Sequence, residues 1–121
     1  MSCYSDYHGW FPLKDEEIKK RITRTEPGTY VLGVVNAGAF IHKYIGRSDN
    51  DLQRRLSEHV EVKYSHFYYK QFDSVISTFL EECTLYHELD GLDNENHPAK
   101  PRDIDVKCLF GECNFSRQSS P

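Results

Sequence analysis

The chain has 121 residues, of which 38% are hydrophobic and 28% are charged. This length suits one domain with a single core and leaves no room for a second, and the balance of residue types excludes a disordered polyelectrolyte and a membrane protein. The net charge of −4 argues against a protein that coats nucleic acid by charge alone, because such binding needs many Lys and Arg contacts to phosphate.

The N-terminus gives an expectation about location. Residues 1–10 lack the charged and apolar regions of a signal peptide, and no apolar stretch reaches the length of a membrane span. We therefore expect a cytoplasmic protein, or a nuclear one in a eukaryotic cell, without membrane contact.

The first predicted elements are a short helix and a β-hairpin. Residues 15–25 place acidic side chains in the first turn and basic ones in the last, which matches a helix dipole, and Pro27-Gly28 ends the helix. Residues 30–35 and 40–45 are rich in β-branched and aromatic side chains, and residues 36–38 between them have turn chemistry. These two runs predict antiparallel strands.

Three further elements follow the hairpin. Residues 49–60 repeat apolar side chains at a spacing of four, which indicates a helix with Ser48 or Asp49 as its N-cap. Residues 64–72 are dense in aromatic side chains and suit a third strand, and residues 75–89 show helical periodicity. The sequence therefore predicts an α+β fold in which a three-stranded antiparallel sheet is flanked by helices.

The last part of the chain is expected to hold less regular structure. Residues 90–102 are rich in Gly, Asn, Asp and Pro and predict an irregular segment, whereas residues 104–110 suit a short strand. Residues 97–115 are a candidate for a zinc-stapled segment, and residues 116–121 are expected to be a loose tail. The whole chain, residues 1–121, is expected to form one domain.

Three short motifs lie on the predicted hairpin and on the helix after it. Gly28-Thr29-Tyr30 opens the first strand, Tyr44-Ile45-Gly46 closes the second, and Arg55 and His59 lie on the helix. In this order the motifs resemble the core of the GIY-YIG nucleases, which continues to a Glu on the next long helix and an Asn beyond it. The resemblance covers about residues 28–96, and it implies a GIY-YIG-like fold and cleavage of nucleic acid.

The chain departs from the family pattern in two places. Thr29 stands where the family has an Ile, and the segment between Tyr30 and Tyr44 looks slightly long, which suggests a lengthened hairpin tip at residues 36–39. Neither departure removes a group with a chemical role.

The residue types of the motifs suit phosphodiester cleavage. An antiparallel hairpin brings Tyr30 near Tyr44, and Arg55 and His59 share one face of a helix because they are four residues apart. A guanidinium can clamp a phosphate while an imidazole moves a proton. Taken singly, the tyrosines could be core aromatics and the other two solvated side chains, but their joint order favours a function.

Glu82 is the candidate metal ligand. It lies at the edge of the apolar stripe of the helix at 75–89, whereas Glu81 points nearly opposite to that stripe. The family resemblance agrees, because residues 82–85 match its E-x-x-L pattern. A single carboxylate, together with water and substrate phosphate, suits Mg²⁺ or Mn²⁺.

Further site candidates lie around this core. The resemblance implies a late Asn, for which Asn94 and Asn96 are both open and Asn94 is preferred by its distance from Glu82; either could instead form a turn. Candidate substrate-binding residues that would contact phosphate are Arg47, Arg54, Lys20 and Arg21. The last two also suit a solvated helix face.

The four cysteines favour metal ligation or burial over disulfides, because the chain carries no recognisable secretory signal. Cys83 and His87 are four residues apart on a predicted helix, and Cys108 and Cys113 follow later. Together they could hold structural Zn²⁺ in a Cys₃His site, with His97 as a replacement for His87. Two buried thiols and two incidental ones explain the pattern equally well.

These features together predict a metal-dependent endonuclease that hydrolyses phosphodiester bonds, in DNA more than in RNA. Two other classes stay open: a non-catalytic nucleic-acid or protein binding module on the same fold, and a zinc-stapled interaction domain. The family usually takes its specificity from attached domains, so here a protein partner, a homodimer or the basic helix at 15–25 is expected to supply it.

Overall fold

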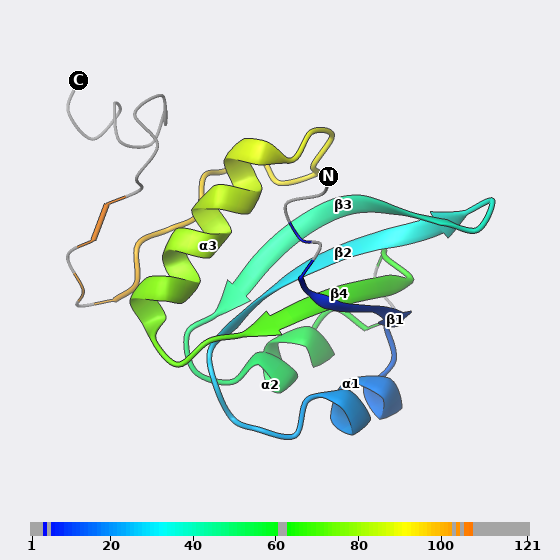
Figure 1. The fold of residues 1–121 in the computed structure, drawn as a ribbon, viewed down its shortest axis with the longest axis horizontal. Coiled ribbons are helices and arrows are strands. Elements are labelled where there is room, and N and C mark those ends of the chain that lie inside the picture. Colours follow the sequence, from blue (N-terminus) through cyan, green and yellow to red (C-terminus); the bar gives the residue numbers. More distant parts are fainter. Residues whose placement is uncertain (1–3, 5, 61–62, 103, 105, 108–121) are drawn as a thin grey trace.

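A four-stranded antiparallel sheet lies at the centre of the part of the chain that the structure describes (Figure 1). In this computed structural model the described residues are 4, 6–60, 63–102, 104 and 106–107. The strand order is β1-β4-β2-β3, so β1 and β3 are the edge strands. The elements in chain order are β1 (His8–Pro12), α1 (Asp15–Arg21), β2 (Gly28–Asn36), β3 (Ala39–Ser48), α2 (Leu52–Ser57), β4 (His66–Gln71) and α3 (Val75–Glu88).

Helices cover both faces of the sheet, with α3 on one face and α1 and α2 on the other (Figure 1). Successive residues of a strand point to opposite faces, and β2 uses this alternation to fill two cores. Tyr30 and Leu32 pack with the side chains of α1 and α2, whereas Val31 packs with Leu85 of α3. Each helix layer is therefore held to the sheet by its own hydrophobic cluster.

The hairpin of β2 and β3 differs from the expected one in its turn. The strands pair along their whole length, and only Ala37 and Gly38 form the turn, with φ values of 52° and 79°. A two-residue turn with positive φ at both positions matches the right-handed twist of the strands. The additional residues therefore lengthen the strands rather than the tip, with a bulge between Leu32 and Gly33.

Strand β1 is the main difference from the expected three-stranded sheet. It pairs with β4, but its residues 8–12 include Gly and Pro, which weaken the sequence signal of a strand. Conversely, the described residues of the strand expected at 104–110, Ile104, Val106 and Lys107, lie in no strand. The expected α+β class, an antiparallel sheet flanked by helices, is confirmed.

Helix α2 is shorter than the helix expected at 49–60 and has a different cap. The carboxylate of Asp51 accepts a hydrogen bond of 3.2 Å from the backbone N–H of Arg54, which makes Asp51 the N-cap. The expected caps, Ser48 and Asp49, precede it; the Ser48 hydroxyl instead accepts from the Asp51 N–H at 2.9 Å.

The irregular segment after α3 covers the open edge of β3. The N–H of Asp93 donates to the carbonyl of Lys43 at 2.5 Å, and the side-chain amide of Asn94 pairs with the backbone of Ile45. Part of the hydrogen-bonding capacity of this edge is thus satisfied without another strand. The segment is also placed close to α3, where it borders the pocket described below.

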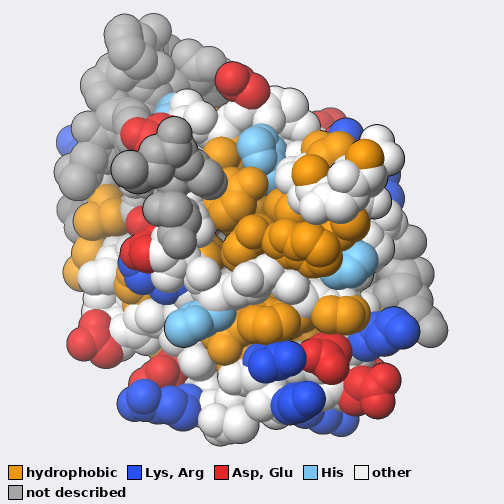
Figure 2. Space-filling view, turned by 45° about the vertical axis from the view of Figure 1, so that its right-hand side comes forward, with side chains coloured by type: hydrophobic (Ala, Val, Ile, Leu, Met, Phe, Trp, Pro, Cys, Tyr) orange, Lys and Arg blue, Asp and Glu red, His pale blue; other side chains and the backbone are white. Residues whose placement is uncertain are grey.

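Figure 2 shows one face of the molecule, on which hydrophobic side chains gather near the centre and most charged side chains lie along the lower margin. Trp10 and Ile41 are 37% and 39% exposed. Acidic and basic side chains are interspersed on the face shown in Figure 2, so any charge-driven contact on it must be local. None of the helices among the described residues is long and apolar enough to cross a membrane.

Candidate active site

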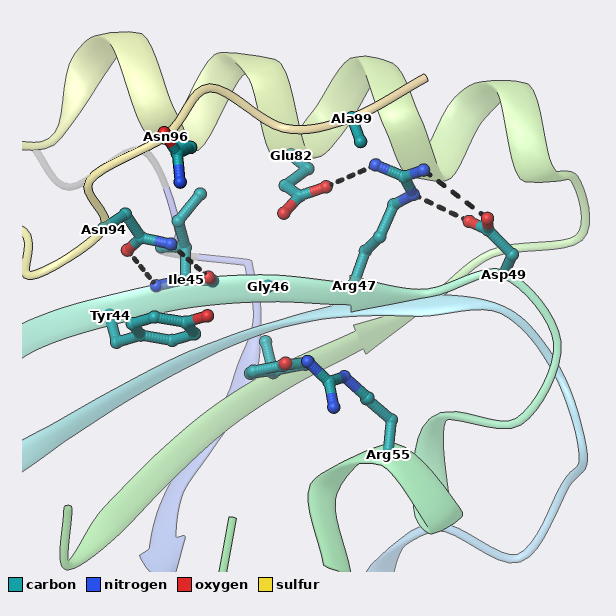
Figure 3. Close-up of a pocket in the computed structure, with 11 residues that line it drawn as sticks. Tyr44, Ile45, Gly46, Arg47, Asp49, Arg55, Glu82, Asn94, Asn96 and Ala99 are labelled. Carbon is teal, nitrogen blue, oxygen red and sulfur yellow. Dashed lines mark hydrogen bonds and ion pairs between the residues drawn. The ribbon is translucent and has the colours of Figure 1, made fainter. Parts of the chain in front are cut away.

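A pocket of about 360 Å³ lies at the β3 edge of the sheet, between α2 and α3 (Figure 3). Its lining comes from β2, β3, the loop after β3, both helices and the segment after α3. The lining residues are Tyr30, Tyr44, Ile45, Gly46, Arg47, Asp49, Arg55, Glu82, Asn94, Asn96 and Ala99. The structure therefore brings together Tyr30, Tyr44, Arg55, Glu82 and Asn94, all of which are sequence candidates.

Tyr30 borders the pocket with a ring that is fully buried. Its hydroxyl forms a hydrogen bond of 2.8 Å with Nε2 of His59. Across the hairpin, Gly46 pairs with Tyr30 and leaves space for the phenol, because a Cβ at this position would overlap the phenol oxygen. Burial raises the pKa of Tyr30 above that of a free phenol, and the nearby charge of Arg55 works against this rise.

From the sequence, His59 is expected on the helix with Arg55, but α2 ends at Ser57 and His59 lies in the turn that follows, where it contacts both tyrosines. Its ring centroid is 5.3 Å from that of Tyr30 and 5.7 Å from that of Tyr44. Burial, and secondly the charge of Arg55, lower the pKa of His59 below its ordinary value of 6.5. The imidazole is therefore mainly neutral at pH 7, the form that can accept a proton.

Arg55 reaches the pocket from α2. Its Nη1 lies 2.5 Å from Oε1 of Glu58, and the two side chains are 42% and 48% exposed. An ion pair at this exposure contributes little and exchanges readily with water. The guanidinium of Arg55 can therefore turn to a phosphate without a large loss of binding energy.

Glu82 faces the pocket from α3 and is paired with Arg47 of β3. The distance from Arg47 Nη1 to Glu82 Oε1 is 2.7 Å, and Arg47 Nε also lies 2.7 Å from Oδ1 of Asp49. Burial raises the pKa of Glu82, and the charge of Arg47 opposes that rise. Glu81 makes a different contact, because its Oε2 accepts a hydrogen bond of 2.7 Å from the Tyr7 hydroxyl.

The donor type at Glu82 fits a hard divalent cation. Figure 3 shows one carboxylate oxygen of Glu82 on Arg47 and the other directed away from it, toward the pocket. Carboxylate oxygen is a preferred ligand of Mg²⁺, which keeps several water molecules and binds through one or two carboxylates. Within the described part of the chain, no three His, Cys, Asp or Glu side chains form a group that could hold a metal.

The two candidate asparagines differ in their contacts. Oδ1 of Asn94 accepts a hydrogen bond of 2.9 Å from the Ile45 N–H, and Nδ2 of Asn94 donates one of 2.8 Å to the Ile45 carbonyl. Both ends of this amide are thus bonded to the backbone of β3. Asn96 is exposed and lines the same pocket. The geometry makes Asn94 an anchor of its loop.

The remaining basic candidates lie outside this pocket. Arg54, Lys20 and Arg21 are exposed, and none of them lines it. Arg54 borders a neighbouring hollow that it shares with Arg55. Arg21 forms an ion pair of 3.3 Å with Glu17 on its own helix.

The predicted zinc ligands are described only in part. The Sγ of Cys83 lies 3.9 Å from Nε2 of His97, and the ring centroids of His87 and His97 are 5.3 Å apart. Nδ1 of His97 is hydrogen-bonded to a backbone carbonyl at 2.8 Å. The other two predicted ligands, Cys108 and Cys113, lie outside the described residues.

The segment that forms this pocket matches a family model described as the GIY-YIG catalytic domain, over residues 26–100. The chain belongs to the GIY-YIG family. The match confirms the resemblance inferred from the motifs, and it includes every residue that lines the pocket. GIY-YIG is a nuclease-type superfamily, so membership implies a nucleic-acid substrate. No curated protein and no solved structure matches the chain.

Two residues near the GIY-YIG pocket were not predicted from the sequence. The sequence suggests Asp49 only as a helix cap, yet it lines the pocket and binds Arg47. Tyr64 lies beside Tyr44, with ring centroids 5.8 Å apart, and its hydroxyl donates to Asp93 at 2.8 Å. Neither residue has a distinctive spacing, so only the fold reveals these contacts.

Proposed function

We propose that this GIY-YIG domain is an endonuclease that hydrolyses phosphodiester bonds, in DNA more than in RNA, with Mg²⁺ or Mn²⁺. The observation that supports the proposal is that Tyr30, Tyr44, Arg55 and Glu82 line one pocket. Phenol, guanidinium and carboxylate groups are suited to binding a phosphate, moving a proton and holding a metal. Family membership supports the same class of reaction.

Charge stabilisation is the role of Arg55 and Glu82 in this proposal. Glu82 would hold the divalent cation, which when bound supplies Lewis-acid stabilisation of the leaving oxygen. Arg55 meets the negative charge that develops on the phosphate, and its weak pairing with Glu58 leaves it available. The two residues come from opposite faces of the sheet, so a phosphate between them would be contacted from both sides.

Proton transfer is the role of His59 and the tyrosines. The hydroxyl of Tyr30 gives its proton to Nε2 of neutral His59 as it takes one from the attacking water, along the 2.8 Å hydrogen bond that joins them. Tyr44 lies against the same imidazole and lines the pocket, where its hydroxyl orients the reacting groups. His59 is only half-buried, so it can release the proton to solvent.

Substrate contacts beyond the pocket are proposed for the remaining basic residues. Arg54 is the nearest, because it shares a hollow with Arg55, while Lys20 and Arg21 on α1 would contact the phosphate backbone further away. The choice of sequence or structure in the nucleic acid would come from a protein partner or a homodimer.

Cleavage of labelled single- and double-stranded DNA and RNA, with Mg²⁺ or Mn²⁺ and with chelator, tests this function. We expect cutting within the strand that needs the metal and that falls about 10²-fold in Arg55→Ala. Arg102→Ala, at an exposed arginine that does not line the pocket, is the control and should cut like the wild type. A wild type that binds these substrates without cutting any of them would instead indicate the alternative, a non-catalytic binding module.

For the C-terminal part of the chain, we propose that Cys83, His97, Cys108 and Cys113 hold structural Zn²⁺. The 3.9 Å distance between Cys83 and His97 supports the first two ligands. Nδ1 of His97 is bonded to a carbonyl and Nε2 faces Cys83, and a histidine that binds a metal commonly uses its other ring nitrogen in such a bond. His97 thus takes the place that the helical spacing gave to His87.

The position of Val106 supports the participation of Cys108. Val106 packs against the cluster of Phe79 and Cys83, and Cys108 follows it by two residues, a span of at most about 7 Å. Zinc at this place would tie the end of the pocket-lining segment to α3.

Elemental analysis of the purified protein tests the zinc site. We expect about one Zn²⁺ per chain, lost in Cys83→Ser and in His97→Ala and kept in His87→Ala. Wild-type protein without zinc would refute the site, and loss of zinc in His87→Ala with retention in His97→Ala would reverse the choice of histidine.

A further inference from the structure

Arg47 connects the two carboxylates that border the pocket, those of Asp49 and Glu82 (Figure 3). Its Nη1 lies 2.7 Å from Glu82 Oε1, its Nε 2.7 Å from Asp49 Oδ1, and its Nη2 3.4 Å from Asp49 Oδ2. The side chains of Arg47 and Glu82 are only 11% and 10% exposed. Their ion pair is therefore shielded from solvent, unlike the exposed pair of Arg55 and Glu58.

The guanidinium of Arg47 is fixed by its surroundings. Two of its nitrogens face the carboxylate of Asp49 while a third binds Glu82, an arrangement that requires the planar fork of arginine. Its Cζ also lies 5.2 Å from the centre of the Phe79 ring. Because the guanidinium cannot turn, the Glu82 carboxylate can form its hydrogen bond to Arg47 in only one orientation.

The fixed guanidinium determines how Glu82 faces the pocket. Oε1 of Glu82 is bound to Arg47, and Figure 3 shows the second oxygen directed away from Arg47. The last torsion of a Glu side chain is intrinsically broad, so without Arg47 the carboxylate would lose this orientation. Partners that orient a metal ligand commonly change metal affinity by about 10- to 100-fold.

The balance of charge permits Arg47 to assist a cation rather than compete with it. An isolated guanidinium next to Glu82 would repel a divalent ion. Asp49 neutralises Arg47, so the three groups together carry about one net negative charge. The cluster therefore still attracts a cation, and Asp49 largely cancels the repulsion between the cation and the guanidinium of Arg47.

We propose that Arg47 is a positioning residue that holds the Glu82 carboxylate in the orientation that binds a divalent cation. The proposal rests on the proposed function of Glu82 as the metal ligand. It gives Arg47 a role different from the phosphate contact that the sequence suggests.

Titration of Mn²⁺ against the full chain, followed by the electron paramagnetic resonance signal of free Mn²⁺, tests this role without measuring cleavage. We expect Arg47→Met to weaken Mn²⁺ binding about tenfold or more, and Arg47→Lys to restore part of the affinity, because an ammonium keeps the charge but not the fork. Arg24→Met is the matched control: Arg24 is 75% exposed and paired with Glu26. It should bind Mn²⁺ like the wild type.

The outcomes separate this inference from the proposed function. Unchanged or tighter binding in Arg47→Met, as expected if Arg47 merely repelled the cation, overturns the positioning role alone. A wild type that binds no Mn²⁺ overturns the metal role of Glu82 and this inference with it. Thermal unfolding checks that the variants are folded. If Arg47→Met does not fold, the Mn²⁺ affinity of Arg47→Lys is compared with that of the wild type. Equal affinities would overturn the proposal.

Discussion

Gly46 contributes to the site by having no side chain. A Cβ at this position would overlap the oxygen and Cζ of the Tyr30 phenol, and Tyr30 is fully buried and cannot retreat. We expect Gly46→Ala to lower the free energy of unfolding by about 1–3 kcal/mol, the usual cost of overpacking. Urea denaturation of the wild type and the variant measures this change.

A double mutant tests whether the Tyr30 hydroxyl causes the expected strain. Adding Tyr30→Phe to Gly46→Ala removes the oxygen that the new methyl group meets, so part of the lost stability should return. Equal effects of Gly46→Ala with and without the Tyr30 hydroxyl would show that this contact is not the cause.

His59 gives the proposed reaction a pH dependence. Its pKa lies below 6.5 because of burial and then the charge of Arg55, and only the neutral imidazole accepts a proton. The cleavage rate at saturating Mn²⁺ should therefore rise with pH through that lowered pKa and level off by neutral pH. His59→Gln should cut more slowly, and its cleavage rate should not show this rise with pH. If the variant keeps the same rise, the group that titrates is not His59.

The segment after α3 acts as a substitute for a fifth strand at the β3 edge. Asn94 bonds both backbone groups of Ile45, a residue that is fully buried. We expect Asn94→Ala to cost about 1–3 kcal/mol in the free energy of unfolding, because two backbone groups lose their partners. The exposed Asn96 is the matched control, and Asn96→Ala should change stability by less than about 0.5 kcal/mol. Similar effects of the two substitutions in chemical denaturation would contradict the anchoring role of Asn94.

The elements that the sequence predicts well are those with a local signal. Helix α3 has a helical repeat of apolar side chains and is found at 75–88, close to the expected 75–89. The β2 and β3 hairpin carries β-branched runs on both sides of a turn. Tyr30 and Tyr44 meet because they belong to the two strands of this hairpin, whereas the meeting of Glu82 with them follows from the family resemblance and not from a local rule.

The features that the sequence does not predict depend on long-range contacts. Strand β1 contains Gly9 and Pro12 and forms because β4 offers a partner. The use of the Asn94 amide on the backbone of Ile45, and the bridging of Asp49 and Glu82 by Arg47, join positions far apart in the chain. Neither the periodicity of apolar residues nor the spacing of motifs in the sequence predicts contacts of this kind.

At the scale of the whole molecule, the site exists only where three layers meet. The edge strand β3 lies between Arg55, which comes from the α2 layer, and Glu82, which comes from the α3 layer, and both reach the same pocket (Figure 3). The net charge of the chain is −4, so attraction of nucleic acid has to arise locally from the basic residues near this edge.

Metal-dependent cleavage by Glu82→Gln and by Glu81→Gln tests the proposed active site most directly. The two glutamates are neighbours on α3, but Glu82 lines the pocket, whereas Glu81 bonds Tyr7. With Mg²⁺ or Mn²⁺, we expect Glu82→Gln to lose about 10²-fold or more of the cleavage rate while Glu81→Gln cuts like the wild type. Cleavage by Glu82→Gln within a few-fold of the wild type would contradict the proposed active site.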